Sequence, residues 1–234
     1  MKRLSLSRCS MDTLRALLLA LTSLCAGCGD EPAPPLPEPT SEPSPPGPPD
    51  ASLFDRPLCE ADGRISTHRL NPSKPYDYYE LQWAGNKSDW SIQYQILEGT
   101  GVKCKTASDV NKCNDAFSLL KGKQSDGFRL YLYFSQVHWY YFATTVGDTV
   151  ALNTNLLEFL GEIDTPQEAA LVLWAHFYGM ACDDAQYGGV RKVADGYEVI
   201  ALYGQRWSNK TYRALFLVRP DGTFTEQWRE VIHE

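Results

Sequence analysis

Few residues in this sequence have types and spacings suited to catalysis or metal binding. His176 is followed by Asp183 and Asp184, and such a set could bind a metal ion or exchange protons. A half-buried, hydrogen-bonded histidine is far commoner than such a site, so we favour that interpretation. The other histidines are scattered, with no partner spacing: His68, His138 and His233. We therefore assign no catalytic residue, no metal ligand and no cofactor.

Short sequence motifs do not supply an active site either. The sequence contains no Gly-x-Ser-x-Gly elbow. Gly99-Thr100-Gly101 lacks the third glycine and the lysine of a phosphate-binding loop, so a turn is the better interpretation. Acidic residues are plentiful, and a carboxylate pair for glycoside hydrolysis stays open among Glu158, Glu162, Glu198 and Glu226.

Aromatic residues are concentrated in one stretch. Residues 131–142 (YLYFSQVHWYYF) contain seven aromatic residues in twelve. Tyrosine and tryptophan on an exposed sheet face can stack on sugar rings or other ligands. Burial in the core is the alternative explanation of this density. Alternation along the chain selects the side chains of an expected binding face, which are Tyr131, Tyr133, Trp139 and Tyr141.

The composition is that of a globular protein with a mild negative charge. Of 234 residues, 43% are hydrophobic and 22% are charged, which excludes a wholly disordered chain. The formal net charge is −7, and no run of lysine and arginine follows the first residues. Nucleic-acid-binding proteins usually carry a basic face, so we expect no nucleic-acid partner.

Residues 1–27 are typical of a secretory signal peptide. Residues 16–24 (ALLLALTSL) form an apolar segment that is too short to span a membrane stably. This segment runs into Cys25-Ala26-Gly27-Cys28, which resembles the lipobox of bacterial lipoproteins. The resemblance implies that Cys28 becomes the mature N-terminus and carries diacyl groups such as palmitate, and Gly29 after it favours the outer membrane. Ordinary signal cleavage and secretion is the alternative.

A proline-rich spacer follows the expected anchor. Residues 29–50 contain ten prolines and no basic residue. This composition is typical of a semi-rigid polyproline-type linker. We therefore expect a signal peptide over residues 1–27, a lipidated cysteine with an acidic linker over residues 28–50, and one globular domain over residues 51–234.

Four cysteines lie in the globular part, and an oxidising exported compartment favours two disulfides. Cys104 and Cys113 flank one short segment (CKTASDVNKC) and can meet locally, so we prefer this pair. That choice leaves Cys59 to pair with Cys182. A four-cysteine zinc site is disfavoured because these residues show no CxxC-type spacing.

Hydrophobic patterning predicts an α+β domain dominated by antiparallel sheet. Alternation or β-rich composition predicts strands at residues 78–83, 90–96, 128–134, 137–146, 149–152, 190–193, 197–203, 212–218 and 224–232. Helices are expected over residues 109–121 and about 165–178. The second begins with a capping box, Thr165-Pro166-Gln167-Glu168, and its apolar composition predicts burial. The strands after it are expected to form an antiparallel meander.

Two segments extend the resemblance to lipoproteins. CKTASDVNKC, and LGEIDTPQEAALVLWA with the strands after it, resemble blocks of uncharacterised exported lipoproteins of Gram-negative soil bacteria. That group has no activity that the resemblance could transfer to this chain, so the resemblance assigns no catalytic residue.

We therefore expect a lipid-anchored cell-envelope protein with a non-catalytic binding or structural domain. Its expected partners are the membrane, through the lipid, and an envelope glycan or protein. Two alternatives stay open. One is an envelope hydrolase with an unrecognised acid–base site, and the other is an inhibitor or immunity-type module.

Overall fold

A computed structural model describes the chain over residues 47–86, 92–120, 126–133, 136–204 and 209–233. All of these residues belong to one compact unit, residues 45–234. At residues 86, 92, 130–133 and 136–138 the description covers the backbone alone.

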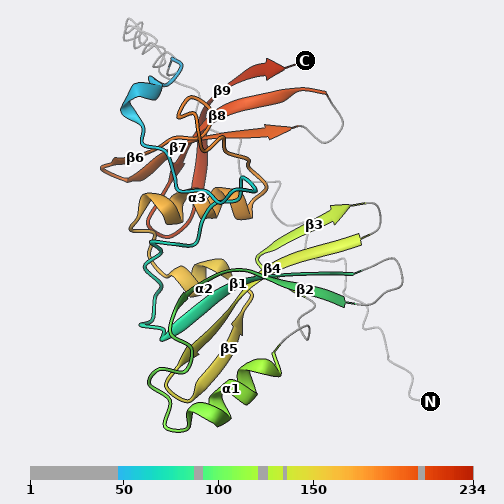
Figure 1. Cartoon of the computed structure of the whole chain (residues 1–234). Helices are drawn as coiled ribbons and strands as arrows, with labels where there is room; N and C mark the ends of the chain where they lie inside the picture. Colours follow the sequence, from blue (N-terminus) through green and yellow to red (C-terminus); the bar gives the residue numbers. More distant parts are fainter. Residues whose placement is uncertain (1–46, 87–91, 121–125, 134–135, 205–208, 234) are drawn as a thin grey trace, which may run out of the picture. The chain divides into compact units, whose positions relative to one another are not determined.

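Within the described residues, five antiparallel strands form the first sheet (Figure 1). They are β1 (Tyr78–Asn86), β2 (Ile92–Gly101), β3 (Arg129–Tyr133), β4 (Gln136–Val146) and β5 (Thr149–Asn153). Their order is β2-β1-β4-β3, and β5 pairs with the half of β4 that β3 leaves unpaired. Strand β4 is therefore bonded on both sides, whereas β2 lies at an edge of the sheet.

The second sheet is a four-stranded antiparallel meander. Its strands are β6 (Val190–Val193), β7 (Gly196–Gly204), β8 (Thr211–Val218) and β9 (Phe224–His233), and they pair in chain order. Every residue of β8 from Arg213 to Val218 is buried, and those after Arg213 form a continuous apolar run. The edge strand β9 alternates in part and is largely exposed.

The helices of the described part are short. They are η1 (Ala51–Leu53), α1 (Val110–Ser118), α2 (Leu156–Leu160) and α3 (Pro166–Ala175). The capping box of α3 is formed on both sides, between the Thr165 side chain and the side chain of Glu168. None of these helices is long and apolar enough to cross a membrane.

Helix α3 lies within the main hydrophobic core. All of its residues from Gln167 to Ala175 are buried, and it packs against β6 and β7. The same core cluster includes Leu81 and Phe142 of the first sheet and Phe159 of α2. The rings of Phe142 and Phe159 stack with their centroids 4.0 Å apart. Apolar burial of this extent is the main source of stability in such a domain.

The sheet-dominated α+β class predicted from the sequence is confirmed. Three local features differ from expectation. Gly99-Thr100-Gly101, expected to form a turn, are the last residues of β2 and pair with β1. Helix α3 ends at Ala175, because His176 has left helical geometry and Phe177 has a positive φ of 72°. Helix α2, capped by Asn155, was not expected, since five residues are too short for a periodic signal.

Two disulfides link the described cysteines. Cys59 pairs with Cys182 and Cys104 pairs with Cys113, with Cα atoms 5.9 Å and 6.0 Å apart respectively. These are the pairs that the sequence favours. Two disulfides in one domain indicate a protein that folds outside the cytoplasm.

The expected aromatic binding face is wrong for two of its four residues. Trp139 is 2% exposed and Tyr141 is fully buried. They belong to the central strand β4 and cluster with Ala84 of β1 and Leu152 of β5. Neighbouring strands and packing therefore cover them. The side chains of the other two, Tyr131 and Tyr133, lie outside the described part of the structure.

Candidate functional site

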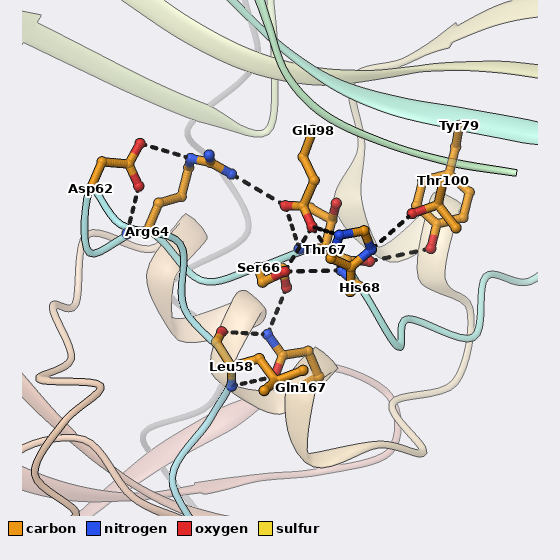
Figure 2. Close-up of polar contacts among 10 residues, drawn as sticks. All are labelled: Leu58, Asp62, Arg64, Ser66, Thr67, His68, Tyr79, Glu98, Thr100 and Gln167. Carbon is orange, nitrogen blue, oxygen red and sulfur yellow. Dashed lines mark hydrogen bonds and ion pairs between the residues drawn. The ribbon is translucent and has the colours of Figure 1, made fainter.

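The most concentrated polar site surrounds the carboxylate of Glu98 on β2 (Figure 2). The Glu98 side chain is only 5% exposed. Its Oε1 accepts hydrogen bonds from the Ser66 hydroxyl at 2.7 Å and from the His68 amide at 3.1 Å. Its Oε2 accepts one from the Thr67 amide at 2.8 Å. One buried carboxylate thus holds three consecutive residues of a loop.

That loop is bent before it reaches Glu98. The Glu60 amide donates to the Arg64 carbonyl, and the Gly63 amide donates back to the Glu60 carbonyl. Gly63 has a φ of 76°, which glycine adopts without strain. The Asp62 carboxylate accepts from the Arg64 amide and completes the turn. Residues 60–64 therefore form a tight turn that returns the chain toward the sheet.

A glutamine on α3 holds the same loop from the opposite side. The Gln167 amide group bonds both backbone groups of Leu58, at 2.9 Å and 2.8 Å. It also donates to the Ser66 carbonyl at 2.6 Å. Figure 2 shows Ser66 between Glu98 and Gln167. The loop is therefore clamped between β2 and α3, and its side chains are held in place.

Electrostatics keep Glu98 ionised. Burial raises the pKa of this carboxyl, but the hydrogen bonds from Thr67 and Ser66 together with the charge of His68 outweigh burial, and the net pKa lies below its ordinary value. The Arg64 guanidinium lies 3.4 Å from Oε2 and adds a positive charge beside it. The site therefore contains a fixed, negatively charged carboxylate that faces the loop of residues 66–68.

His68 links this buried anion to solvent. Its Nε2 lies 3.2 Å from Glu98 Oε1, and its side chain is 57% exposed. Its other ring nitrogen, Nδ1, lies 3.4 Å from the Thr100 hydroxyl. A carboxylate on one ring nitrogen and a hydroxyl on the other fix the plane of the imidazole. Such a ring can exchange protons or bind a metal.

Within the described residues, one group of three side chains has ligating atoms close enough to share a metal ion. These are Glu60, His68 and Glu98, whose ligating atoms all lie within 4.8 Å of one another. Glu60 also borders an open hollow of about 650 Å³ beside the Cys59–Cys182 disulfide. The group is therefore accessible from outside the domain.

His176, which the sequence suggested as a possible site residue, does not form a site with Asp183 and Asp184. His176 packs edge-on against the Phe224 ring at 4.9 Å, and burial lowers the pKa of its imidazole. Asp183 and Asp184 are exposed, and no metal-ligand group among the described residues includes them. His233 is exposed near the end of β9, and the side chain of His138 lies outside the described part.

The four glutamates considered for a glycoside-hydrolase pair are not brought together either. Glu198 is paired with Arg191, and Glu226 accepts from the Tyr203 hydroxyl at 3.0 Å. Glu158 and Glu162 are exposed on and just after α2. These two contacts join strands of the second sheet, β6 with β7 and β7 with β9, and neither brings two of the four glutamates together.

A second feature is a hollow at the edge strand of the first sheet. It has a volume of about 460 Å³ and is lined by Trp83 of β1 and by Gln93, Tyr94 and Gln95 of β2. Trp83 lies opposite Gln95, so Trp83, Gln93 and Gln95 present their side chains on one face of the sheet, whereas Tyr94 lies opposite Ala84 and presents its ring on the other face. None of the four described lining residues is charged. Tyr94 is 40% exposed. Such a lining suits an uncharged, polar ligand that presents flat faces.

Sequence reasoning missed both features. Glu98 lies 32 residues from Ser66, so no local spacing connects them. The one local sign of a buried polar group is that the Glu98 carboxylate follows Leu97 within a strand. The edge hollow combines two strands, and its aromatic residue Trp83 lies outside the aromatic-rich residues 131–142.

No protein-family model, no curated protein and no solved structure matches this chain.

Proposed function

We propose that this chain is a lipoprotein of the bacterial outer membrane, anchored through Cys28, whose body binds an envelope glycan without turning it over. The anchor is supported by the lipobox-like residues Cys25-Ala26-Gly27-Cys28. It is also supported by the two disulfides of the body, which suit an oxidising compartment outside the cytoplasm. The proline-rich residues 29–50 would hold the body away from the bilayer.

The hollow at the β2 edge is the observation that carries the binding proposal. Sugar rings present flat apolar faces that stack on aromatic rings, together with hydroxyls that bond to amides. Trp83 supplies the ring, and Gln93 and Gln95 on the same face supply the amides. Since β2 pairs only with β1 among the described strands, this edge is open to a long ligand.

The same lining supports binding rather than hydrolysis. Glycoside hydrolysis needs a pair of carboxyl groups on either side of the scissile bond. None of the four described lining residues is acidic or basic. The hollow therefore supplies recognition groups without a general acid or a nucleophile.

The test is a binding assay with purified peptidoglycan. The full-length protein in detergent is sedimented with insoluble peptidoglycan, and soluble fragments of the same polymer are added as competitors. Trp83→Ala should weaken binding by about tenfold, since one aromatic contact contributes on the order of 1 kcal/mol or more. Ile96→Ala is the control, because Ile96 is 42% exposed on β2 but does not line the hollow.

Equal binding by wild type and Trp83→Ala would refute the proposal. The same conclusion would follow if Ile96→Ala weakened binding as much as Trp83→Ala does. Thermal unfolding of each variant checks that a loss of binding is not a loss of folding.

A further inference from the structure

We propose that Glu60, His68 and Glu98 bind a zinc ion. This site is separate from the edge hollow and does not depend on glycan binding. It also departs from the sequence-based expectation of no metal. No local spacing joins these three residues, because the 60–64 turn and strand β2 bring them together.

The distances in the group suit a small tetrahedral ion. Zinc binds histidine nitrogen and carboxylate oxygen at about 2.0–2.2 Å, so two ligand atoms of one tetrahedron lie about 3.3 Å apart. His68 Nε2 and Glu98 Oε1 are 3.2 Å apart. An ion can replace the contact between these two atoms without moving either side chain. The Glu60 carboxylate lies within 4.8 Å of both ligand atoms and, as a side chain at the rim, can close on the ion by rotation.

The residues around the group orient two of its ligands. Glu98 is held by the Ser66 hydroxyl and the Thr67 amide, so its carboxylate is already fixed. When His68 Nε2 binds a metal, Nδ1 carries the proton, and the Thr100 hydroxyl at 3.4 Å is positioned to accept it. A partner on the second ring nitrogen is the usual arrangement around a metal-bound histidine.

The position of Arg64 is compatible with this arrangement. Its guanidinium contacts Oε2 of Glu98, whereas His68 faces Oε1. The cation and the guanidinium would therefore use different oxygens of one carboxylate. The positive charge of Arg64 would weaken the site, and we expect moderate rather than extreme affinity.

The ligand set selects zinc over calcium and magnesium. Calcium takes six to eight oxygen ligands and magnesium demands an octahedron of oxygens, whereas zinc accepts imidazole nitrogen and carboxylate oxygen together in a four-coordinate site. Three protein ligands leave the fourth tetrahedral position to water. That position is open to solvent, since His68 is 57% exposed and Glu60 borders the hollow beside the disulfide.

The test uses full-length protein in detergent that has been stripped with EDTA. Zn²⁺ is titrated in competition with a chromophoric chelator, and Co²⁺ is used as a spectroscopic probe. Wild type should bind one Zn²⁺, and His68→Ala and Glu60→Gln should each weaken binding by more than about tenfold. His233→Ala is the control, because His233 is exposed and lies outside the group. Zn²⁺ should also raise the unfolding temperature of wild type and not that of His68→Ala.

Three results would overturn the proposal. The first is wild-type binding too weak to compete with the chelator. The second is equal Zn²⁺ affinity in wild type and in a folded His68→Ala variant, or an equal loss in His233→Ala. The third is a Co²⁺ complex with an intense near-ultraviolet thiolate band, because that band would place the ion on cysteine sulfur rather than on nitrogen and oxygen ligands.

Discussion

Gln82 on β1 and Tyr141 on β4 lie directly opposite each other, and each leaves a buried polar atom without a hydrogen-bond partner among the described residues. Both side chains are fully buried. The Gln82 amide nitrogen donates to Glu80, but its Oε1 has no donor. Burial, with the nearby charge of Glu80, raises the pKa of Tyr141 to about 12 and keeps its hydroxyl protonated. This face of the sheet therefore contains polar groups that cost stability.

Replacement of the Tyr141 hydroxyl should thus be harmless or beneficial. A buried donor without a partner costs about 1–3 kcal/mol. Tyr141→Phe removes that donor and keeps the ring, so the free energy of unfolding in urea should stay the same or rise. Tyr79→Phe is the control, because the Tyr79 hydroxyl donates to the Thr67 carbonyl at 3.2 Å. That change should cost about 1 kcal/mol. A similar loss in both variants would show that Tyr141 does have a partner.

The two disulfides should contribute unequally to stability. Cys59–Cys182 spans 123 residues and Cys104–Cys113 spans nine. In the chain-entropy model, a longer loop removes more freedom from the unfolded chain, which gives about 5 and about 3 kcal/mol respectively. Paired replacement by alanine should therefore lower the unfolding free energy more for Cys59 with Cys182. The measurement is urea unfolding of each double variant, after non-reducing peptide mapping of wild type.

Equal losses from the two double variants would mean that the loop-entropy argument fails for this domain. Peptide mapping that recovered Cys59 linked to Cys104 would contradict the pairing itself.

Asp77 should make the domain sensitive to acid. The hydroxyl and amide of Thr106 and the amide of Gly147 donate to this carboxylate and lower its pKa below the ordinary 3.8. A carboxyl with a lowered folded-state pKa contributes stability that is complete above its unfolded pKa and is lost as the pH falls through the folded one. Asp77→Asn should therefore be less stable than wild type near pH 6, by an amount that shrinks below about pH 4.

Urea unfolding across this pH range measures that difference. Asp195→Asn, which changes an exposed carboxylate between β6 and β7, is the matched control and should show no such trend. A stability difference for Asp77→Asn that stays constant down to about pH 2 would rule out titration of this carboxyl as the cause.

Local signals account for the elements that the sequence predicted. Thr165 and Glu168 are three residues apart, and their capping box is formed as expected at the start of α3. Cys104 and Cys113 are nine residues apart, and they meet across the segment that leads into α1. In each case, the contact joins residues close together in the sequence, so the local sequence is enough to predict it.

Features that depend on distant contacts were missed or wrong. The aromatic density of residues 131–142 does not reveal that Trp139 packs on Ala84, 55 residues earlier. The site at Glu98 depends on Ser66, 32 residues away, and on Gln167, 101 residues from Ser66. Periodicity describes which face of a strand is apolar. It does not describe what covers that face. The burial of β4 and the position of the loop held by Glu98 and Gln167 can therefore be seen only in the folded structure.

Cys28→Ala should release the protein from the membrane or leave an unprocessed precursor. If Cys28 carries two acyl chains, each buried methylene contributes about 0.8 kcal/mol to membrane binding, and two chains are enough for stable anchoring. Membrane fractionation and labelling with a clickable fatty acid measure the loss. Cys25→Ala is the control, because bulky Leu24 precedes Cys25 whereas the small residues Ala26 and Gly27 precede Cys28. Labelling should persist in Cys25→Ala and disappear in Cys28→Ala. Unchanged fractionation, labelling and N-terminal processing in Cys28→Ala would exclude the lipid anchor and leave a freely secreted protein.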